Sequence, residues 1–81
     1  EVVPTIVALR TKLEAIAETE IKKTLHSSKI PESGIEPIKK MAEALINRIM
    51  HDPTLFLKKD SMTGDKSKNI DTVRKLFNLD K

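Results

Sequence analysis

Three polar residues near the middle of the chain have side chains that could take part in chemistry: Asn47, Arg48 and His51. On a helix, Asn47 and His51 lie one turn apart and point away from the apolar face. Such a pair could bind a ligand or orient a nucleophile, but no nucleophile pattern accompanies it, and no carboxylates stand at a metal-binding spacing. The alternative is structural: His51 meets the last carbonyls of its helix, and Asn47 holds the turn at residues 52–54. We favour the structural interpretation.

Two lysine pairs, Lys22–Lys23 and Lys39–Lys40, are candidates for contacts with phosphate. The net charge of +3, however, comes from 15 basic and 12 acidic residues that are interleaved, which is typical of a solvated helical surface. Stacking on single-stranded bases needs aromatic side chains, and two Phe are the only aromatic residues. A small basic helical domain that binds nucleic acid is therefore the weaker alternative.

The elements that position these residues are predicted to be helices, because no segment alternates with the period of a strand. We expect a long helix from Pro4 to about His26, and a second helix that ends at about His51 and begins at the capping-box spacing of Ser33 and Glu36. A proline after an aspartate favours a new short helix, with Asp52 as its N-cap and Pro53 at its first position. Further expectations are a third helix over residues 53–59, a loop over Asp60–Lys68 and a last helix over residues 69–78.

The first helix carries two apolar stripes. One contains Val2, Ile6, Leu9, Leu13 and Ile16, and the other contains Val3, Val7, Ile21 and Leu25. A surface helix needs only one such stripe, so the second indicates a contact beyond its own domain. Glu20 continues the first stripe, where it either marks the end of burial or is a buried, paired carboxylate. Arg10 with Glu14, and Glu18 with Lys22, have the spacing of exposed ion pairs.

Composition excludes several classes of protein. The chain has 81 residues, of which 38% are hydrophobic and 33% charged, and it contains no Cys and two Gly. These values exclude disulfide frameworks, cysteine chemistry and a glycine-rich phosphate loop. No apolar run reaches the length of a membrane span, and no signal peptide is recognisable, so we expect a cytoplasmic protein that binds neither membrane nor metal. The small apolar content predicts a marginal core that a partner surface completes.

Four segments, in this order, resemble the C-terminal dimerisation domain of glutamyl-tRNA reductase over nearly the whole chain. They are Thr5–Arg10 with Glu14–Ile16 and Glu20–Lys23, then Asn47-Arg48-Ile49-Met50-His51-Asp52-Pro53-Thr54, then Gly64-Asp65, and finally Leu76–Asp80. Ala17 stands where the family often has Arg, and Ile21 where Leu is usual. These two departures affect local ion pairing more than the resemblance.

The resemblance implies that residues 1–81 are one all-α dimerisation domain, a fragment of a longer enzyme. That enzyme would use NADPH to reduce glutamyl-tRNA to glutamate-1-semialdehyde for tetrapyrrole (porphyrin) synthesis, with its cysteine nucleophile and nicotinamide site in other domains. The fragment would then hold no catalytic residue and no cofactor, and its partner would be a second copy of itself. A hetero-oligomeric adaptor is a further alternative. We expect seven residues to be buried in the core or in the dimer contact: Ile6, Leu9, Leu13, Ile16, Ile38, Leu45 and Ile49.

Overall fold

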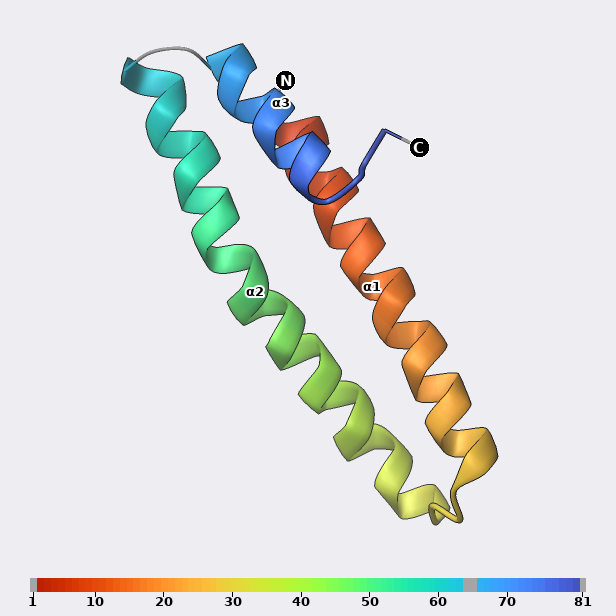
Figure 1. Ribbon diagram of the computed structural model, residues 1–81. Helices are drawn as coiled ribbons and strands as arrows, with labels where there is room; N and C mark the ends of the chain where they lie inside the picture. Colours follow the sequence, from red (N-terminus) through yellow and green to blue (C-terminus); the bar gives the residue numbers. More distant parts are fainter. Residues whose placement is uncertain (1, 64–65, 81) are drawn as a thin grey trace.

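The computed structural model describes residues 2–63 and 66–80, and three helices account for most of them. They are α1 (Val2–Ser27), α2 (Ile35–Thr63) and α3 (Lys66–Leu76), with a short 3₁₀ turn, η1 (Glu32–Gly34), in front of α2. α1 and α2 form an antiparallel pair, and α3 returns alongside the N-terminal half of α1 (Figure 1). The predicted all-α class is confirmed.

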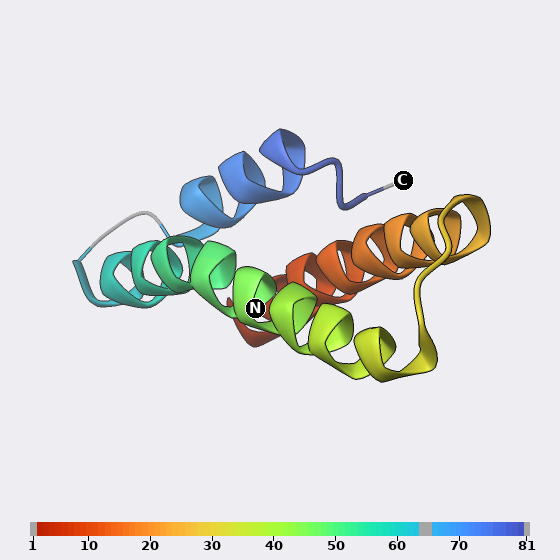
Figure 2. The same ribbon diagram turned by 90° about the horizontal axis from the view of Figure 1, so that it is seen from below.

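The molecule is long and thin, with extents of 51 × 23 × 15 Å. α3 lies against only one end of the α1–α2 pair, and the opposite end is a two-helix hairpin (Figure 2). Such a shape has little interior, because two helices alone cannot enclose the apolar residues on their facing sides.

Both ends of α1 lie close to their predicted positions. Pro4 falls in the first turn, where a missing N–H costs no helical hydrogen bond. At the other end, the Ser28 N–H donates to the Thr24 carbonyl at 3.0 Å, and Pro31 follows shortly afterwards. Ser33 lies inside η1, whose Gly34 N–H donates to the Pro31 carbonyl at 2.8 Å, so α2 begins after this turn rather than at Ser33.

The predicted break at residues 52–53 is wrong: α2 passes through Pro53 without interruption. A proline inside a helix removes one backbone hydrogen bond and costs about 3 kcal/mol. Burial on both sides offsets this cost, since Met50 is 3% exposed and Leu57 is 1% exposed. The short helix expected over residues 53–59 is therefore part of α2.

The loop expected over Asp60–Lys68 is also wrong for residues 60–63, which are the last turn of α2, and for residues 66–68, which are the first turn of α3. Gly64 and Asp65 lie outside the described residues. The Ser, Lys and Asp residues of this segment favour loops only weakly, and a preference of that size does not by itself end a helix.

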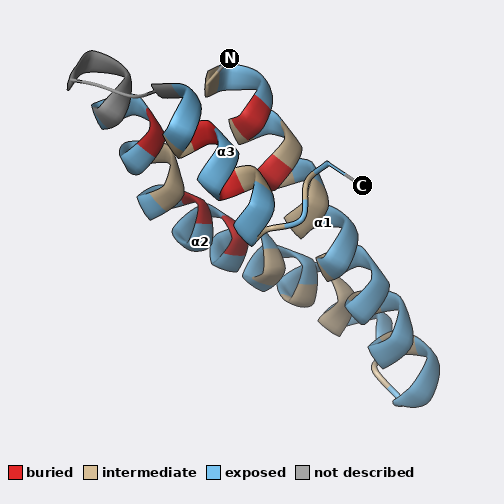
Figure 3. Cartoon of the chain, turned by 45° about the horizontal axis from the view of Figure 1, so that its top comes forward, coloured by how far each residue is buried: buried red, intermediate tan, exposed pale blue. Residues whose placement is uncertain are grey.

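The core consists of two clusters at the end of the molecule that α3 covers (Figure 3). Leu9, Ile46 and Met50 form the first, and Leu57, Ile70 and Val73 form the second. Phe77 and Leu79, at and beyond the end of α3, pack against both. Among the described residues, none between Arg10 and Leu45 is buried, so the hairpin end has no core of its own.

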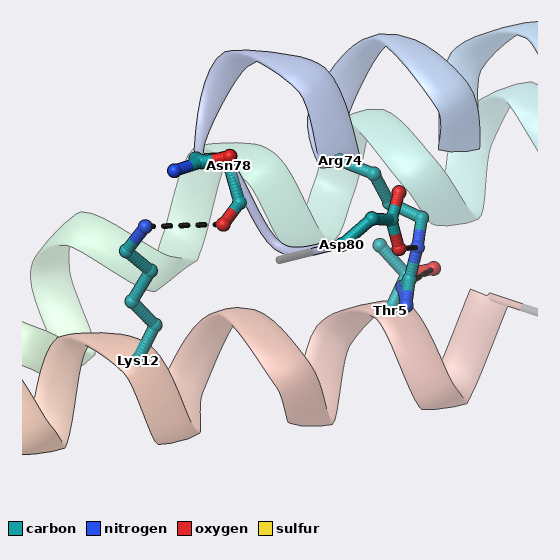
Figure 4. Close-up of polar contacts among 5 residues, drawn as sticks. All are labelled: Thr5, Lys12, Arg74, Asn78 and Asp80. Carbon is teal, nitrogen blue, oxygen red and sulfur yellow. Dashed lines mark hydrogen bonds and ion pairs between the residues drawn. The ribbon is translucent and has the colours of Figure 1, made fainter.

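Polar contacts fasten the end of α3 to α1 (Figure 4). The Lys12 ammonium donates to the Phe77 carbonyl at 2.7 Å and to the Asn78 carbonyl at 3.2 Å. Arg74 donates to the Thr5 hydroxyl at 3.2 Å and to the Asp80 carboxylate at 2.8 Å. Asn78 has a φ of 55°, and the Leu79 N–H donates to the Arg74 carbonyl at 2.9 Å, which together form a Schellman C-cap.

Candidate interaction surface

An apolar groove of about 390 Å³ lies between α1 and α2 towards the hairpin end. We call it the hairpin groove. Its lining comes from one stripe on each helix: Leu13, Ile16, Ala17, Glu20, Ile21 and Thr24 on α1, and Ile38, Met41, Ala42, Leu45, Ile46 and Ile49 on α2. Both stripes follow the helical spacing of three to four residues, which places their side chains on one face of each helix.

Large apolar side chains in the hairpin groove remain open to solvent. Ile16 is 50% exposed, Met41 58%, Leu45 52% and Ile49 49%. None of the described residues of α3 lines this groove. A contiguous apolar surface of this kind is typical of contact sites, because leaving it in water is unfavourable, and it makes the hairpin groove the candidate interaction surface.

The structure divides the seven apolar residues predicted for core or interface between two places. Leu9 is fully buried in the first core cluster, and Ile6 packs against both clusters. The other five line the hairpin groove: Leu13, Ile16, Ile38, Leu45 and Ile49. Leu13 also packs against the first core cluster, so it links the core to the groove.

Charge is almost absent from the hairpin groove. Glu20 is the one ionisable residue among the described residues that line it, and α2 contributes none. The Glu20 carboxylate lies 3.3 Å from the Lys23 ammonium on the next turn of α1, and the Glu20 side chain is 63% exposed. The groove therefore offers a partner an apolar surface with one anionic group near the hairpin end.

The opposite side of the α1–α2 pair has a different character. It carries a wider hollow of about 900 Å³ that shares Ala17, Ile21, Ala42 and Ile46 with the groove, so these four residues lie between the two. Charged residues surround this second hollow, and they include the predicted ion pairs, Arg10–Glu14 at 4.0 Å and Glu18–Lys22 at 3.9 Å.

The second apolar stripe predicted on α1 is split by the fold. Ile21 and Leu25 line the charged hollow, whereas Val3 and Val7 are 67% and 56% exposed near the start of α1. Ile21 also lines the hairpin groove, so this residue belongs to both sides of the helix pair.

The polar motif lies on the outside of α2. Asn47, Arg48 and His51 are exposed and, with Asp52, line a shallow hollow of about 420 Å³. The interpretation of His51 as a residue at a helix C-terminus is wrong, because α2 continues as far as Thr63. The next residues but one, Pro53 and Thr54, are half-buried parts of the same helix. Among the described residues, no three His, Cys, Asp or Glu side chains come close enough to hold a metal ion.

Sequence reasoning missed several buried residues. Met50 and Leu57 are seven positions apart, the spacing of a heptad, which signals one continuous helix with a shared buried side. Thr5 is 1% exposed and accepts a hydrogen bond from Arg74, which is 69 positions away. No local signal predicts that contact.

Comparison with known proteins agrees with the resemblance. The family model described as "Glutamyl-tRNAGlu reductase, dimerisation domain" matches residues 1–79. The glutamyl-tRNA reductase of Geobacter sulfurreducens is 39% identical over 80 residues, which are 98% of this chain and 18% of that protein. The reductase of Syntrophobacter fumaroxidans is 40% identical over 79 residues, 96% of this chain and 17% of that protein. The reductase of Desulfatibacillum aliphaticivorans is 41% identical over 81 residues, 98% of this chain and 19% of that protein.

The chain thus spans less than a fifth of the length of these relatives. No solved structure matches it. Within the described residues, none of the helices combines the length and the apolar character that crossing a membrane requires.

Proposed function

The chain belongs to the family of glutamyl-tRNA reductase dimerisation domains, and we propose that it dimerises by placing its hairpin groove against the same groove of a second copy. A two-fold contact uses one patch twice, so the patch must be complementary to itself. An almost purely apolar groove meets this condition, because apolar surfaces need no matching pattern of charge.

The observation that carries the proposal is the uneven distribution of burial. The end covered by α3 has two buried clusters, whereas the hairpin end has no buried residue among those described and holds four large apolar side chains about half exposed. A second hairpin would supply the missing layer, as α3 does at the other end. In this arrangement Leu13, Ile16, Ile38, Leu45 and Ile49 lie in the contact, and Ile6 and Leu9 support it from the core.

The role of the whole enzyme is part of the proposal. The names of the relatives support a parent protein that reduces glutamyl-tRNA. That its reductant is NADPH, and its product glutamate-1-semialdehyde for tetrapyrrole synthesis, is what the resemblance to this family implies and is proposed on that ground. The cytoplasmic location that the sequence leads us to expect is part of the same proposal. The present chain would hold two catalytic subunits together and take no part in the chemical step.

The experiment is the mass of the 81-residue chain in solution across a concentration series, by sedimentation equilibrium. We expect dimers for the unchanged chain and monomers for Leu45→Glu, because that change places an unpaired carboxylate on the apolar contact. Leu45 is a better target than Leu13, which also packs against the core. Far-UV circular dichroism checks that the variant remains helical.

Leu55→Glu is the matched control. Leu55 is 53% exposed on the same helix, against 52% for Leu45, and lies outside the hairpin groove. We expect this variant to remain dimeric. A dimeric Leu45→Glu chain, or equal weakening by both substitutions, would show that the groove is not the contact. An unchanged chain that stays monomeric at every concentration would support the hetero-oligomeric adaptor instead.

A further inference from the structure

Glu20 lies in the hairpin groove, where self-association through the groove would remove water from its charged carboxylate at a cost in free energy. It lies one turn beyond Ile16 on the apolar stripe of α1, and Thr24, one turn further on, still belongs to the lining. The groove therefore extends past Glu20 in both directions along α1. A second copy that fills the whole groove also covers this carboxylate.

The surroundings of Glu20 offer little compensation for lost water. On α1, its ion-pair partner is Lys23, whose own side chain is 68% exposed. On α2, all the groove residues are apolar: Ile38, Met41, Ala42, Leu45, Ile46 and Ile49. None of the described residues of α3 lines the groove, and a two-fold partner brings the same lining, in which Glu20 again has Lys23 as its ion-pair partner.

We propose that Glu20 limits the strength of self-association and makes the dimer tighter in acid than at neutral pH. This inference rests on the proposed dimer contact through the hairpin groove. Covering a carboxylate with apolar surface disfavours its ionised form. The dimer then binds more protons than two separate chains, so the association constant rises as the pH falls.

The test compares dissociation constants of the 81-residue chain, measured by sedimentation equilibrium at pH 7.5 and at pH 5.0, for the unchanged chain and for Glu20→Gln. Glutamine keeps the size of the side chain and removes the charge. We expect Glu20→Gln to dimerise about tenfold more tightly at pH 7.5, which corresponds to about 1.4 kcal/mol. We also expect acidification to tighten the unchanged dimer more than the Glu20→Gln dimer.

Glu18→Gln is the matched control, because Glu18 lies on the same helix, pairs with Lys22 at 3.9 Å and faces the charged hollow on the other side. It should leave both the dissociation constant and its pH response unchanged. His26 and His51 lie outside the groove and are present in all three chains, so any contribution from them cancels in the comparison.

The outcomes separate this inference from the dimer contact on which it rests. If Leu45→Glu abolishes dimers but Glu20→Gln associates no more tightly than the unchanged chain, the groove stands as the contact and the role of Glu20 is refuted. An equal pH response with and without the Glu20 carboxylate would refute it as well. A chain that is monomeric under all conditions would overturn both proposals.

Discussion

Removing the ammonium group of Lys12 should loosen α3 from the rest of the molecule. This group donates to the carbonyls of Phe77 and Asn78 at 2.7 and 3.2 Å. Both residues follow the end of α3, where no further turn of helix supplies backbone N–H donors to the carbonyls. Its positive charge also lies at the negative end of the α3 dipole. Lys12→Met keeps most of the apolar stem and removes only the charged donor.

The expected cost follows from the surroundings of the two carbonyls. The bond to Phe77 is partly buried, whereas the bond to Asn78 is exposed and water can replace it. A hydrogen bond from a charged donor contributes about 1.5–3 kcal/mol when it is protected from water. Counting only the Phe77 bond, at the lower end of that range, Lys12→Met should lower the free energy of unfolding by about 1.5 kcal/mol.

Urea denaturation, followed by circular dichroism at one fixed protein concentration, measures this loss. With a slope of about 1–1.5 kcal/mol per M for a chain of this size, the midpoint should fall by about 1 M. The control is Lys22→Met, which removes an exposed ion pair 3.9 Å from Glu18 and should cost only about 0.3–0.5 kcal/mol. Equal midpoints for the two variants would refute the view that Lys12 anchors α3.

Two further substitutions test the backbone of the fold. Pro53→Ala restores an N–H that can donate to the carbonyl of Ile49 within α2. The helix gains about 3 kcal/mol and the unfolded chain, freed of the proline ring, recovers about 1 kcal/mol, so we expect the free energy of unfolding to rise by about 2 kcal/mol and the melting temperature to rise with it. A lower melting temperature would contradict an uninterrupted α2. Asn78 has a φ of 55°, a left-handed conformation that costs free energy for a residue with a methyl or branched side chain. We therefore expect Asn78→Ala to destabilise the chain by about 1 kcal/mol and Asn78→Gly to leave its stability unchanged. Thermal melting that ranks Ala at or above Gly at this position would argue against the Schellman cap.

The error at Pro53 shows why a local signal was insufficient. An aspartate followed by a proline favours the start of a helix. The same two residues can also lie inside a continuous helix, so the pair does not distinguish the two structures. Continuation depends on Met50 and Leu57, which lie on either side of Pro53 and contribute to different core clusters. Their burial needs the other helices in place, so residues 52–54 alone cannot reveal it.

The candidate site was predicted in part. The groove side of α2 repeats Ile38, Met41, Leu45 and Ile49 at helical spacing, and this repeat identifies an apolar face without any structure. Glu20 was also visible as a charged residue in line with an apolar stripe. The division into two different sides, one apolar and one surrounded by charge, was not visible, because it depends on how α1 and α2 are rotated against each other.

The sequence by itself determined the helical class, the position of α1, the apolar stripes and the family, since these depend on local propensity, spacing and residue identity. Only the tertiary structure decided what each stripe is for. Leu9 and Ile16 lie on one stripe of α1, seven residues apart, yet Leu9 is 0% exposed and Ile16 is 50% exposed. The physical reason is the length of α3. Its 11 residues cover one end of a much longer helix pair, and at the other end the same apolar pattern remains exposed to solvent.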